Sequence, residues 1–241
     1  MRNGAWEIWF TGQDVAVYNY AGIELPDLLF FASKVEGDFM IRVGMMTPVY
    51  AAKIERKLIE AYKKIGKVFK FVHLPVQSGS DKVLSLMRRG HKAELFYRLV
   101  DSFRREVEWI TLATDIIVGH PGEEEEDFEE TVRLIERVKP EVVNLSKFGF
   151  RPGTYASKMK QVPTNIVARR SRYLYNLILK VMEERNERWI GWEGEVVVTQ
   201  KGTKKDTWIA RNFAYRPIVI RSEKDLLKWK LVVKIDSVAP T

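Results

Sequence analysis

The stretch from Phe69 to Asp81, FKFVHLPVQSGSD, decides how the rest of this chain is interpreted. Residues 69–76 are mostly apolar, which predicts a buried strand. A polar loop, Gln-Ser-Gly-Ser, follows at residues 77–80. A parallel barrel carries its ligand-binding groups at the carboxyl ends of its strands, so this loop is placed where a binding site is expected. The alternative is that Ser-Gly-Ser-Asp at residues 78–81 only caps the next helix.

The same pattern of an apolar run followed by a polar loop occurs five times. The predicted strands are residues 6–10, 39–46, 69–76, 111–118 and 142–150. Between them, apolar residues at helical spacing predict helices over 25–31, 54–65, 81–89, 92–107 and from the acidic run 123–127 to Pro140. This alternation predicts an α/β fold with a parallel sheet, curled or closed as a barrel, and a site at its C-terminal rim.

The chain changes character after a long helix predicted over residues 163–189. Apolar or alternating runs at 196–199, 208–211, 216–220 and 231–238 predict a small antiparallel β-barrel. We therefore divide the chain into a partial barrel (1–162), a connecting helix (163–190) and a small β-domain (191–241).

Composition excludes several classes of site. The chain of 241 residues contains no cysteine, which excludes disulfides, thiolate metal sites and a cysteine-held iron–sulfur cluster. Its three histidines lack the spacing of a zinc site, so no metal ligands are predicted. There is no apolar run of about 20 residues and no secretory signal pattern, so a cytoplasmic protein is expected.

The formal net charge of +8 is concentrated toward the C-terminus. Residues 1–162 carry a net +1, residues 163–190 a net +3 and residues 191–241 a net +4. Basic residues of the β-domain alternate with Trp208, Phe213 and Tyr215, a combination that suits phosphates and stacked bases. The alternative is that these aromatic residues form the small core. The predicted RNA-binding residues are Lys201, Lys204, Lys205, Arg211 and Arg216.

Polar residues near the predicted strand ends are the candidates for a binding site. They are Gln13, Asp14, Thr47, Gln77, Ser78, Ser80, Asp115, Arg151 and Thr154. They form no Ser-His-Asp triad, and the chain contains no GxxxxGK[ST] phosphate loop. These residues by themselves predict a ligand-binding rim fused to a basic β-domain, with no identified reaction and no identified catalytic residue.

Four ordered motifs carry a family resemblance. They are TGQD at 11–14, HLPVQSGSDKVL at 73–84, TDIIVGHPGE at 114–123 and RPGT at 151–154. Together they resemble the radical SAM methylthiotransferases of the MiaB-like family, and residues 191–241 resemble its RNA-contacting TRAM domain. The segment RVGMMTP at 42–48 is closest to the archaeal and eukaryotic branch that acts on threonylcarbamoyladenosine in tRNA.

The resemblance implies a partial (β/α)6 radical SAM barrel with about five strands present, and a transferase function. Such an enzyme adds a methylthio group to C2 of threonylcarbamoyladenosine beside the tRNA anticodon. Its cofactors are S-adenosylmethionine and two 4Fe-4S clusters. The alternative function is a non-catalytic RNA-binding module with an inert barrel.

The chain departs from the family pattern at its start. It lacks the family's N-terminal domain and the CxxxCxxC loop, so we expect a fragment of a longer protein that holds no cluster and is inactive alone. Without the preceding strand, residues 6–10 would form an exposed edge with Trp6 and Trp9, and exposed edges favour self-association.

Site residues are carried over from the family motifs position by position. Thr11, Gly12, Gln13 and Asp14 match the segment that faces the methionine amino group of S-adenosylmethionine. Gln77 and Ser78 match the loop near its ribose and carboxylate. The segment beside its adenine corresponds to Ile117, Val118 and Gly119, and the end of the sixth strand corresponds to Phe150 and Arg151.

Overall fold

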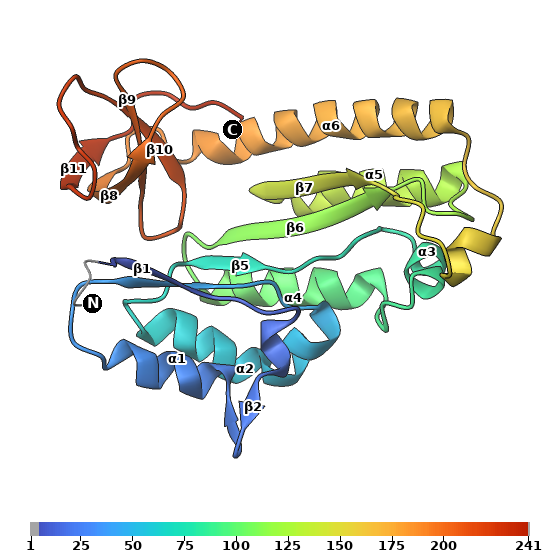
Figure 1. Cartoon of the computed structure of the whole chain (residues 1–241), viewed down its shortest axis with the longest axis horizontal. Helices are drawn as coiled ribbons and strands as arrows, with labels where there is room; N and C mark the ends of the chain where they lie inside the picture. The colour runs from blue at the N-terminus through green and yellow to red at the C-terminus, as the bar shows by residue number, and fades with distance from the viewer. Residues whose placement is uncertain (1–4, 241) are drawn as a thin grey trace.

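The computed structural model describes residues 5–240 and contains five parallel strands that lie side by side in chain order (Figure 1). They are β1 (Glu7–Phe10), β4 (Met40–Val43), β5 (Phe71–His73), β6 (Thr111–Val118) and β7 (Val142–Lys147). β1 pairs with β4, and β5, β6 and β7 form a second ladder. Single parallel bridges, Ile41 with Val68 and Met45 with His73, connect the two ladders. The predicted five-strand α/β half-barrel is confirmed.

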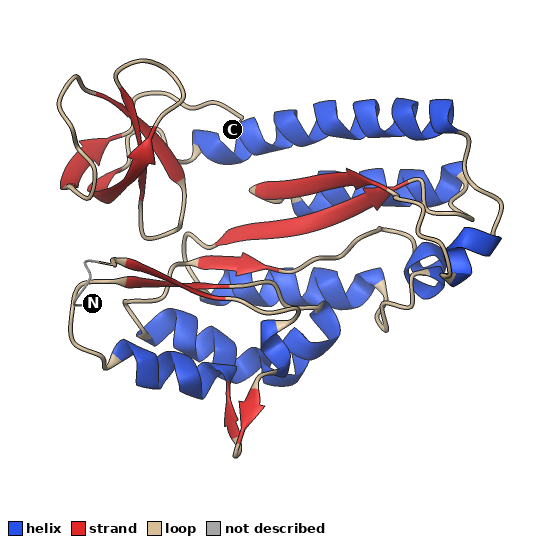
Figure 2. Cartoon of the chain, viewed as in Figure 1, coloured by secondary structure: helices blue, strands red, loops and turns tan. Residues whose placement is uncertain are grey.

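Helices flank these strands, both below and above them in the view of Figure 2. They are α1 (Leu25–Ser33), α2 (Pro48–Lys64), α3 (Asp81–Leu86), α4 (Ala93–Glu106), α5 (Glu125–Val138) and the long α6 (Thr164–Glu187). The longer helices bury a stripe at helical spacing, such as Leu58 and Tyr62 of α2 or Leu99 and Phe103 of α4. The buried side chains form one core between helices and strands.

The ladders are shorter than the apolar runs that predict them. Residues 69–76 are largely buried, yet only Phe71–His73 form β5. Pro75 has no N–H to donate to a ladder. The Thr114 hydroxyl instead accepts from Val76 N (3.2 Å) and donates to Leu74 O (2.8 Å), which replaces the backbone pairing there. Likewise β4 covers four residues of the predicted 39–46, and β7 ends at Lys147 instead of residue 150.

A small hairpin was missed from the sequence. Its strands β2 (Asn19–Tyr20) and β3 (Ile23–Glu24) have two residues each, which is too short for an alternating pattern. Ala21 and Gly22 turn the chain with positive φ values of 51° and 84°. Two short 3-10 helices, η1 (Val15–Val17) and η2 (Tyr155–Lys158), complete the barrel region.

The β-domain is a four-stranded antiparallel sheet of order β10-β9-β8-β11. The strands are β8 (Glu193–Lys201), β9 (Thr207–Arg211), β10 (Pro217–Arg221) and β11 (Lys230–Lys234). Val196, Val198 and Trp208 form its core. The predicted antiparallel strands are present, whereas their closure into a TRAM-like barrel stays a prediction, because the described strands form a sheet with β10 and β11 at its edges. The core alternative for Trp208 is the one observed.

The loop between β9 and β10 docks the β-domain onto the half-barrel. Lys70 N donates to Phe213 O at 2.9 Å, and the Tyr215 ring lies 4.9 Å from Phe69 and 5.1 Å from Phe71 between centroids. The Tyr215 hydroxyl donates to the Glu7 carboxylate at 2.9 Å. The two parts therefore share a packed interface beside β1, β4 and β5. No helix in residues 5–240 is long and apolar enough to cross a bilayer.

We expect the chain to self-associate through β1, which within residues 5–240 has a partner strand only on the β4 side. Trp6 is partly shielded because its ring packs edge-on against Phe69, whereas Trp9 is 55% exposed. Unpaired strand edges with apolar side chains favour pairing between copies. Light scattering over a concentration series should show dimers or larger species, and Trp9→Lys should shift the distribution toward monomer. A wild-type chain that stays monomeric at high concentration would refute this expectation.

Candidate functional site

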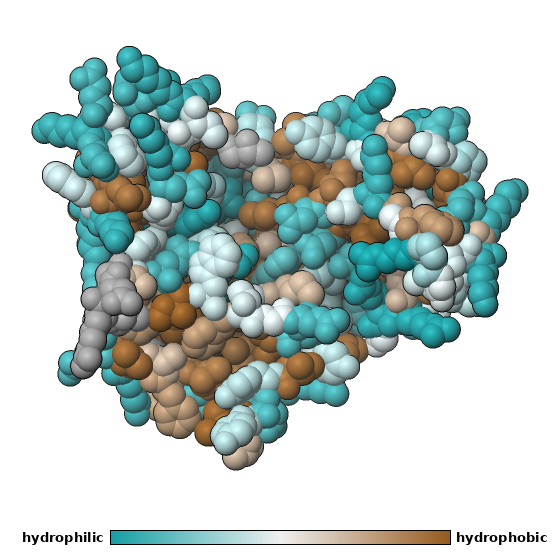
Figure 3. Space-filling view, viewed as in Figure 1, coloured by the Kyte–Doolittle hydropathy of each residue, from teal (hydrophilic) through white to brown (hydrophobic). Residues whose placement is uncertain are grey.

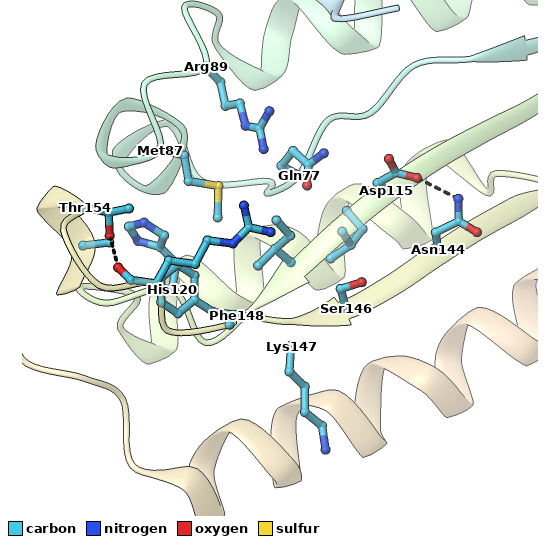
Figure 4. A pocket seen from close by; sticks show the side chains of 15 residues that line it. Gln77, Met87, Arg89, Asp115, His120, Asn144, Ser146, Lys147, Phe148 and Thr154 are labelled. Atoms are coloured by element: carbon cyan, nitrogen blue, oxygen red, sulfur yellow. Dashed lines mark hydrogen bonds between the residues drawn. The ribbon is translucent and has the colours of Figure 1, made fainter. Parts of the chain in front are cut away.

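A cavity of about 700 Å³ opens at the carboxyl ends of β5, β6 and β7 (Figure 4). Its walls combine polar and apolar side chains from these strand ends and from the segments after α3 and β7. The lining residues are Gln77, Met87, Arg89, Asp115, Ile116, Ile117, His120, Asn144, Ser146, Lys147, Phe148, Gly149, Arg151, Thr154 and Ala156. The site thus lies at the predicted end of the sheet.

The backbone of Gln77 adopts a left-handed conformation that is uncommon for residues other than glycine. Its φ is 78°, although it has a side chain, and it is only 7% exposed. Its N–H donates to Asp115 O (2.8 Å) and its carbonyl accepts from Ile117 N (2.9 Å), so the neighbouring strand holds this conformation. Its buried Oε1 has no hydrogen-bond partner among the described residues. Strain and an unsatisfied acceptor are both features of ligand-binding positions.

Asp115 is the acidic residue of the cavity. Its Oδ1 accepts from His73 Nε2 and from Asn144 Nδ2, both at 2.8 Å. Burial opposes ionisation, but hydrogen bonds from His73 and Asn144 outweigh it and lower the pKa of Asp115 below its ordinary value. The cavity therefore contains an ionised carboxylate at neutral pH.

Positive charge lies near this carboxylate. Arg89, Lys147 and Arg151 line the cavity, and within the described residues no carboxylate lies within ion-pair distance of any of them. Figure 4 shows the Arg89 guanidinium directed into the cavity beside Gln77, whereas the Lys147 side chain points away toward α6. The Arg89 Nε is buried without a partner. Arg89 is therefore ready to receive an anionic group.

His120 is the histidine of the cavity. It is 4% exposed, and its ring packs edge-on against Phe148 with centroids 5.1 Å apart. Burial lowers the pKa of His120, so the ring is neutral at pH 7. With Met87, Ile116 and Ile117 it forms a largely apolar wall. The cavity thus combines acceptors, a free guanidinium and a slot that suits a flat base.

The first predicted motif does not line this cavity. Thr11, Gly12 and Gln13 are exposed just after β1. Asp14 accepts from Ala16 N and from Thr47 N, both at 3.0 Å, so its carboxylate caps η1 and holds the start of α2. A structural function accounts for Asp14 and Thr47 in this structure.

The serines after Gln77 face away from the cavity. Ser78 is 1% exposed and its hydroxyl lies 3.2 Å from that of Thr131. Ser80 caps α3 and donates to Asp127 Oδ1 at 2.7 Å. A Cβ on Gly79 would lie 2.4 Å from Glu130 O, so close packing of α5 explains the glycine. For Ser80 the helix-cap alternative is therefore the one observed.

The later motifs are divided between cavity and core. Ile117, Arg151 and Thr154 line the cavity, whereas Val118 is buried and Phe150 is 58% exposed outside it. Gly119 has a φ of 83°, and its N–H donates to Glu123 Oε2 at 3.0 Å, which fixes the loop that carries His120.

Sequence reasoning missed several residues of the cavity. Asn144 and Ser146 alternate with apolar residues in β7, and this alternation could have indicated that both side chains face the cavity. Arg89 and Met87 come from the turn after α3, where no local pattern points to a site. No cluster of three or more potential metal-ligating side chains occurs in residues 5–240.

The predicted RNA-binding residues differ in exposure. Lys201, Lys204 and Lys205 are exposed around the β8–β9 turn. Arg211 donates to Tyr215 O at 3.1 Å and stacks on its ring at 4.0 Å. Arg216 is 7% exposed and donates to Glu141 O at 3.2 Å, so it is part of the domain interface and cannot reach a phosphate in this structure.

The aromatic residues of the β-domain are also largely engaged. Trp208 and Tyr215 are each 8% exposed, and Trp208 Nε1 donates to Ser222 O at 3.1 Å. Phe213 packs against Trp189 and Trp192. The prediction that these three rings stack on bases finds no support in their packing.

A family model for the radical SAM superfamily matches residues 1–135, more than half of the chain. The chain belongs to the radical SAM superfamily. This confirms the superfamily predicted from the motifs. Over 221 residues the chain is 42% identical to a probable threonylcarbamoyladenosine tRNA methylthiotransferase of Pyrococcus horikoshii, covering 91% of this chain and 52% of the relative. A Xenopus laevis protein with the corresponding name is 37% identical over 239 residues, or 97% of this chain and 42% of the relative.

A solved structure supports the same fold for this radical SAM chain. Coproporphyrinogen III oxidase (HemN) from Escherichia coli, described as a radical SAM enzyme, aligns with a TM-score of 0.59 at 14% identity. The alignment covers 86% of this chain and 54% of that structure. At this identity the likeness shows the fold alone. The chain spans about half the length of the curated relatives it matches.

The two cofactors that the superfamily implies fit this chain differently. S-adenosylmethionine fits, because the cavity supplies an unsatisfied Gln77 Oε1, an ionised Asp115 and an unpaired Arg89. A 4Fe-4S cluster does not fit, because cubane clusters are held by cysteine thiolates and the sequence has no cysteine.

Proposed function

We propose that this chain is the cofactor- and RNA-binding part of a tRNA methylthiotransferase that modifies C2 of threonylcarbamoyladenosine. The observation that carries the proposal is the rim cavity of a radical SAM half-barrel in a chain about 40% identical to relatives with this name. When bound, S-adenosylmethionine would supply the methyl group and the radical precursor.

The residues of the cavity match the parts of that cofactor. A zwitterionic sulfonium ligand needs donors for its carboxylate and acceptors for its ammonium and ribose, with an apolar slot for its adenine. We assign the carboxylate to Arg89, polar contacts to Gln77 and Asp115, and the adenine to the wall that includes Ile117. In this assignment residues 11–14 do not contact the cofactor, because they do not line the cavity.

The direct test is a chimera in which this chain replaces the matching half of the Pyrococcus horikoshii relative. Nucleosides from threonylcarbamoylated tRNA would be analysed by mass spectrometry after incubation with the reconstituted chimera. The methylthio derivative is expected from the chimera, and none is expected from an Arg89→Leu chimera or from this chain alone. A chimera that binds tRNA but makes no product would favour the alternative of an RNA-binding module with an inert barrel.

We further propose that the β-domain, which resembles a TRAM domain, contacts the tRNA through Lys201, Lys204 and Lys205. These three lysines are exposed at one turn, and Lys205 has 93% of its side chain exposed. The C-terminal concentration of net charge supports a polyanion partner for this end of the chain. The structure gives less support for a tRNA contact through Arg211 and none for a tRNA contact through Arg216.

Replacing the three lysines by glutamine is expected to weaken tRNA binding about tenfold or more at low salt. Each lost phosphate contact should also make the slope of log affinity against log salt shallower by roughly one unit. A filter-binding titration over a salt series measures both. The control is a triple glutamine variant of Lys53, Lys57 and Lys64, which are on α2 on the other side of the molecule. Equal losses for the two variants would contradict a specific site on the β-domain.

A further inference from the structure

Three polar side chains from three neighbouring strands meet beside the cavity. His73 is the last residue of β5, Asp115 is in β6 and Asn144 is in β7. Asp115 is directly opposite Asn144 in the parallel register, and His73 is opposite Ala113, two residues before Asp115. Because side chains of a strand alternate between faces, these three project from the same face of the sheet.

The two neighbours bind the same oxygen of Asp115. His73 Nε2 and Asn144 Nδ2 both lie 2.8 Å from Oδ1, and Figure 4 shows the Asn144 bond. Oδ2 has no hydrogen-bond partner within residues 5–240, and 23% of the Asp115 side chain is exposed, where it lines the cavity. One oxygen is thus fixed by protein donors and the other is left for a ligand.

The tautomer of His73 follows from this arrangement. An ionised carboxylate only accepts hydrogen bonds, so Nε2 must carry the proton that it shares with Asp115. The His73 side chain is 12% exposed, and its ring packs against Phe71 with centroids 6.5 Å apart. His73 is therefore held on one side by packing and offers a single directed donor to Asp115.

We propose that His73 and Asn144 are positioning residues that orient Asp115, so that its Oδ2 accepts a hydrogen bond from a ribose hydroxyl of an adenosine ligand. The proposal rests on the proposed function, in which the cavity holds S-adenosylmethionine. Carboxylates accept from ribose hydroxyls in the same way in dinucleotide sites.

The charge around Asp115 favours a hydroxyl over an ammonium as its ligand. Arg89 lies close enough for its positive charge to help lower the pKa of Asp115. The same positive charge would repel the ammonium of a ligand and attract its carboxylate. Ile116 and Ile117 follow Asp115 on β6 and line the cavity with it, which places an apolar surface for a base next to the acceptor for the sugar.

The test is calorimetric titration of the full chain with 5′-methylthioadenosine and with its analogue that lacks both ribose hydroxyls. His73→Phe keeps a ring of similar size and removes the donor. We expect it to weaken binding of 5′-methylthioadenosine about tenfold and binding of the dideoxy analogue less than twofold. His73→Gln, whose amide can donate to Asp115, should restore affinity to within about threefold of wild type. Asn144→Leu is the second variant, and it should discriminate between the two ligands as His73→Phe does.

A residue that acts by orienting the Asp115 carboxylate must lose its effect on binding when that carboxylate is absent. In an Asp115→Asn background, His73→Phe should change the affinity for 5′-methylthioadenosine less than twofold. Unchanged affinity in both the His73→Phe and Asn144→Leu variants, or equal losses for the two ligands, would overturn the positioning function while leaving the proposed cofactor site intact. A wild-type chain that binds neither nucleoside would overturn both.

Discussion

Replacing Glu141 by glutamine is expected to destabilise the chain by about 3 to 5 kcal/mol, because the change leaves three arginines around a buried site without their counter-charge. Glu141 is fully buried, and Oε1 accepts from Arg185 Nε at 2.8 Å. Arg104 and Arg188 lie 3.3 and 3.6 Å from its carboxylate oxygens, and Leu112 N donates to it at 2.9 Å.

This cluster joins separate parts of the chain. Arg104 is in α4, Arg185 is in α6 and Arg188 follows α6 directly, while Glu141 precedes β7. Arg216 of the β-domain adds a bond to the Glu141 carbonyl. Loss of the carboxylate should therefore loosen both α6 and the domain interface.

Denaturant unfolding followed by circular dichroism measures the effect, which corresponds to a fall in melting temperature of about 10 °C. The matched control is Glu184→Gln, an exposed glutamate of α6 paired with Lys139, for which little change in stability is expected because solvent screens exposed ion pairs. Similar stability losses for Glu141→Gln and Glu184→Gln would show that the buried cluster contributes no more than a surface ion pair.

The same cluster predicts sensitivity to acid. Burial opposes the ionisation of Glu141, but the positive charges of Arg104, Arg185 and Arg188 outweigh it and lower its pKa. A group whose pKa is lower in the folded state contributes stability above its unfolded pKa, about 4.3 for glutamate, and that contribution is lost as pH falls through the folded value. The wild-type chain should thus lose stability below about pH 4, and Glu141→Gln should show a flatter profile there.

Reconstitution with iron and sulfide under anaerobic conditions is expected to leave this chain without a stoichiometric cluster. The reason is chemical, since the sequence has no cysteine to supply thiolate ligands. Reductant and S-adenosylmethionine should then yield no 5′-deoxyadenosine. Iron analysis after desalting and chromatography of the nucleosides measure the two outcomes.

The control for that experiment is the full-length Pyrococcus horikoshii relative, treated in parallel. Under the proposed function, this relative is expected to gain iron and to form 5′-deoxyadenosine. A chain of this sequence that became brown, retained iron and released 5′-deoxyadenosine would contradict the prediction and would require ligands other than cysteine.

The surface of the β-domain differs in hydropathy from the surface near α1 and β1. Figure 3 shows hydrophilic side chains gathered over the β-domain and brown apolar ones over the region of α1 and β1. Phe30 and Phe31 of α1 are each about half exposed, and Trp9 of β1 is more so. The face predicted to self-associate and the face proposed to contact RNA are therefore different parts of the surface.

The sequence by itself determined the order of strands and helices, the parallel half-barrel and the separate β-domain. These features depend on local periodicity and on short connections, both of which are visible in one chain. Residues 111–118 are a clear example, because a short, mostly apolar run between two predicted helices is typical of a buried strand in such an alternation. The absence of cysteine likewise needed no structure to exclude a thiolate-bound cluster.

Only the tertiary structure decided which polar residues face a ligand and which hold the fold. Ser80 and Gln77 are three residues apart in one loop, yet Ser80 caps a helix and Gln77 has a buried, unpaired oxygen in the cavity. Arg216 looked like a free cation and proved to be buried at the domain interface, while Arg89 showed no local signal and proved to line the site. The physical reason is that a side chain's partners come from strands and helices distant in sequence, so its hydrogen bonds and burial are fixed only when those elements pack together.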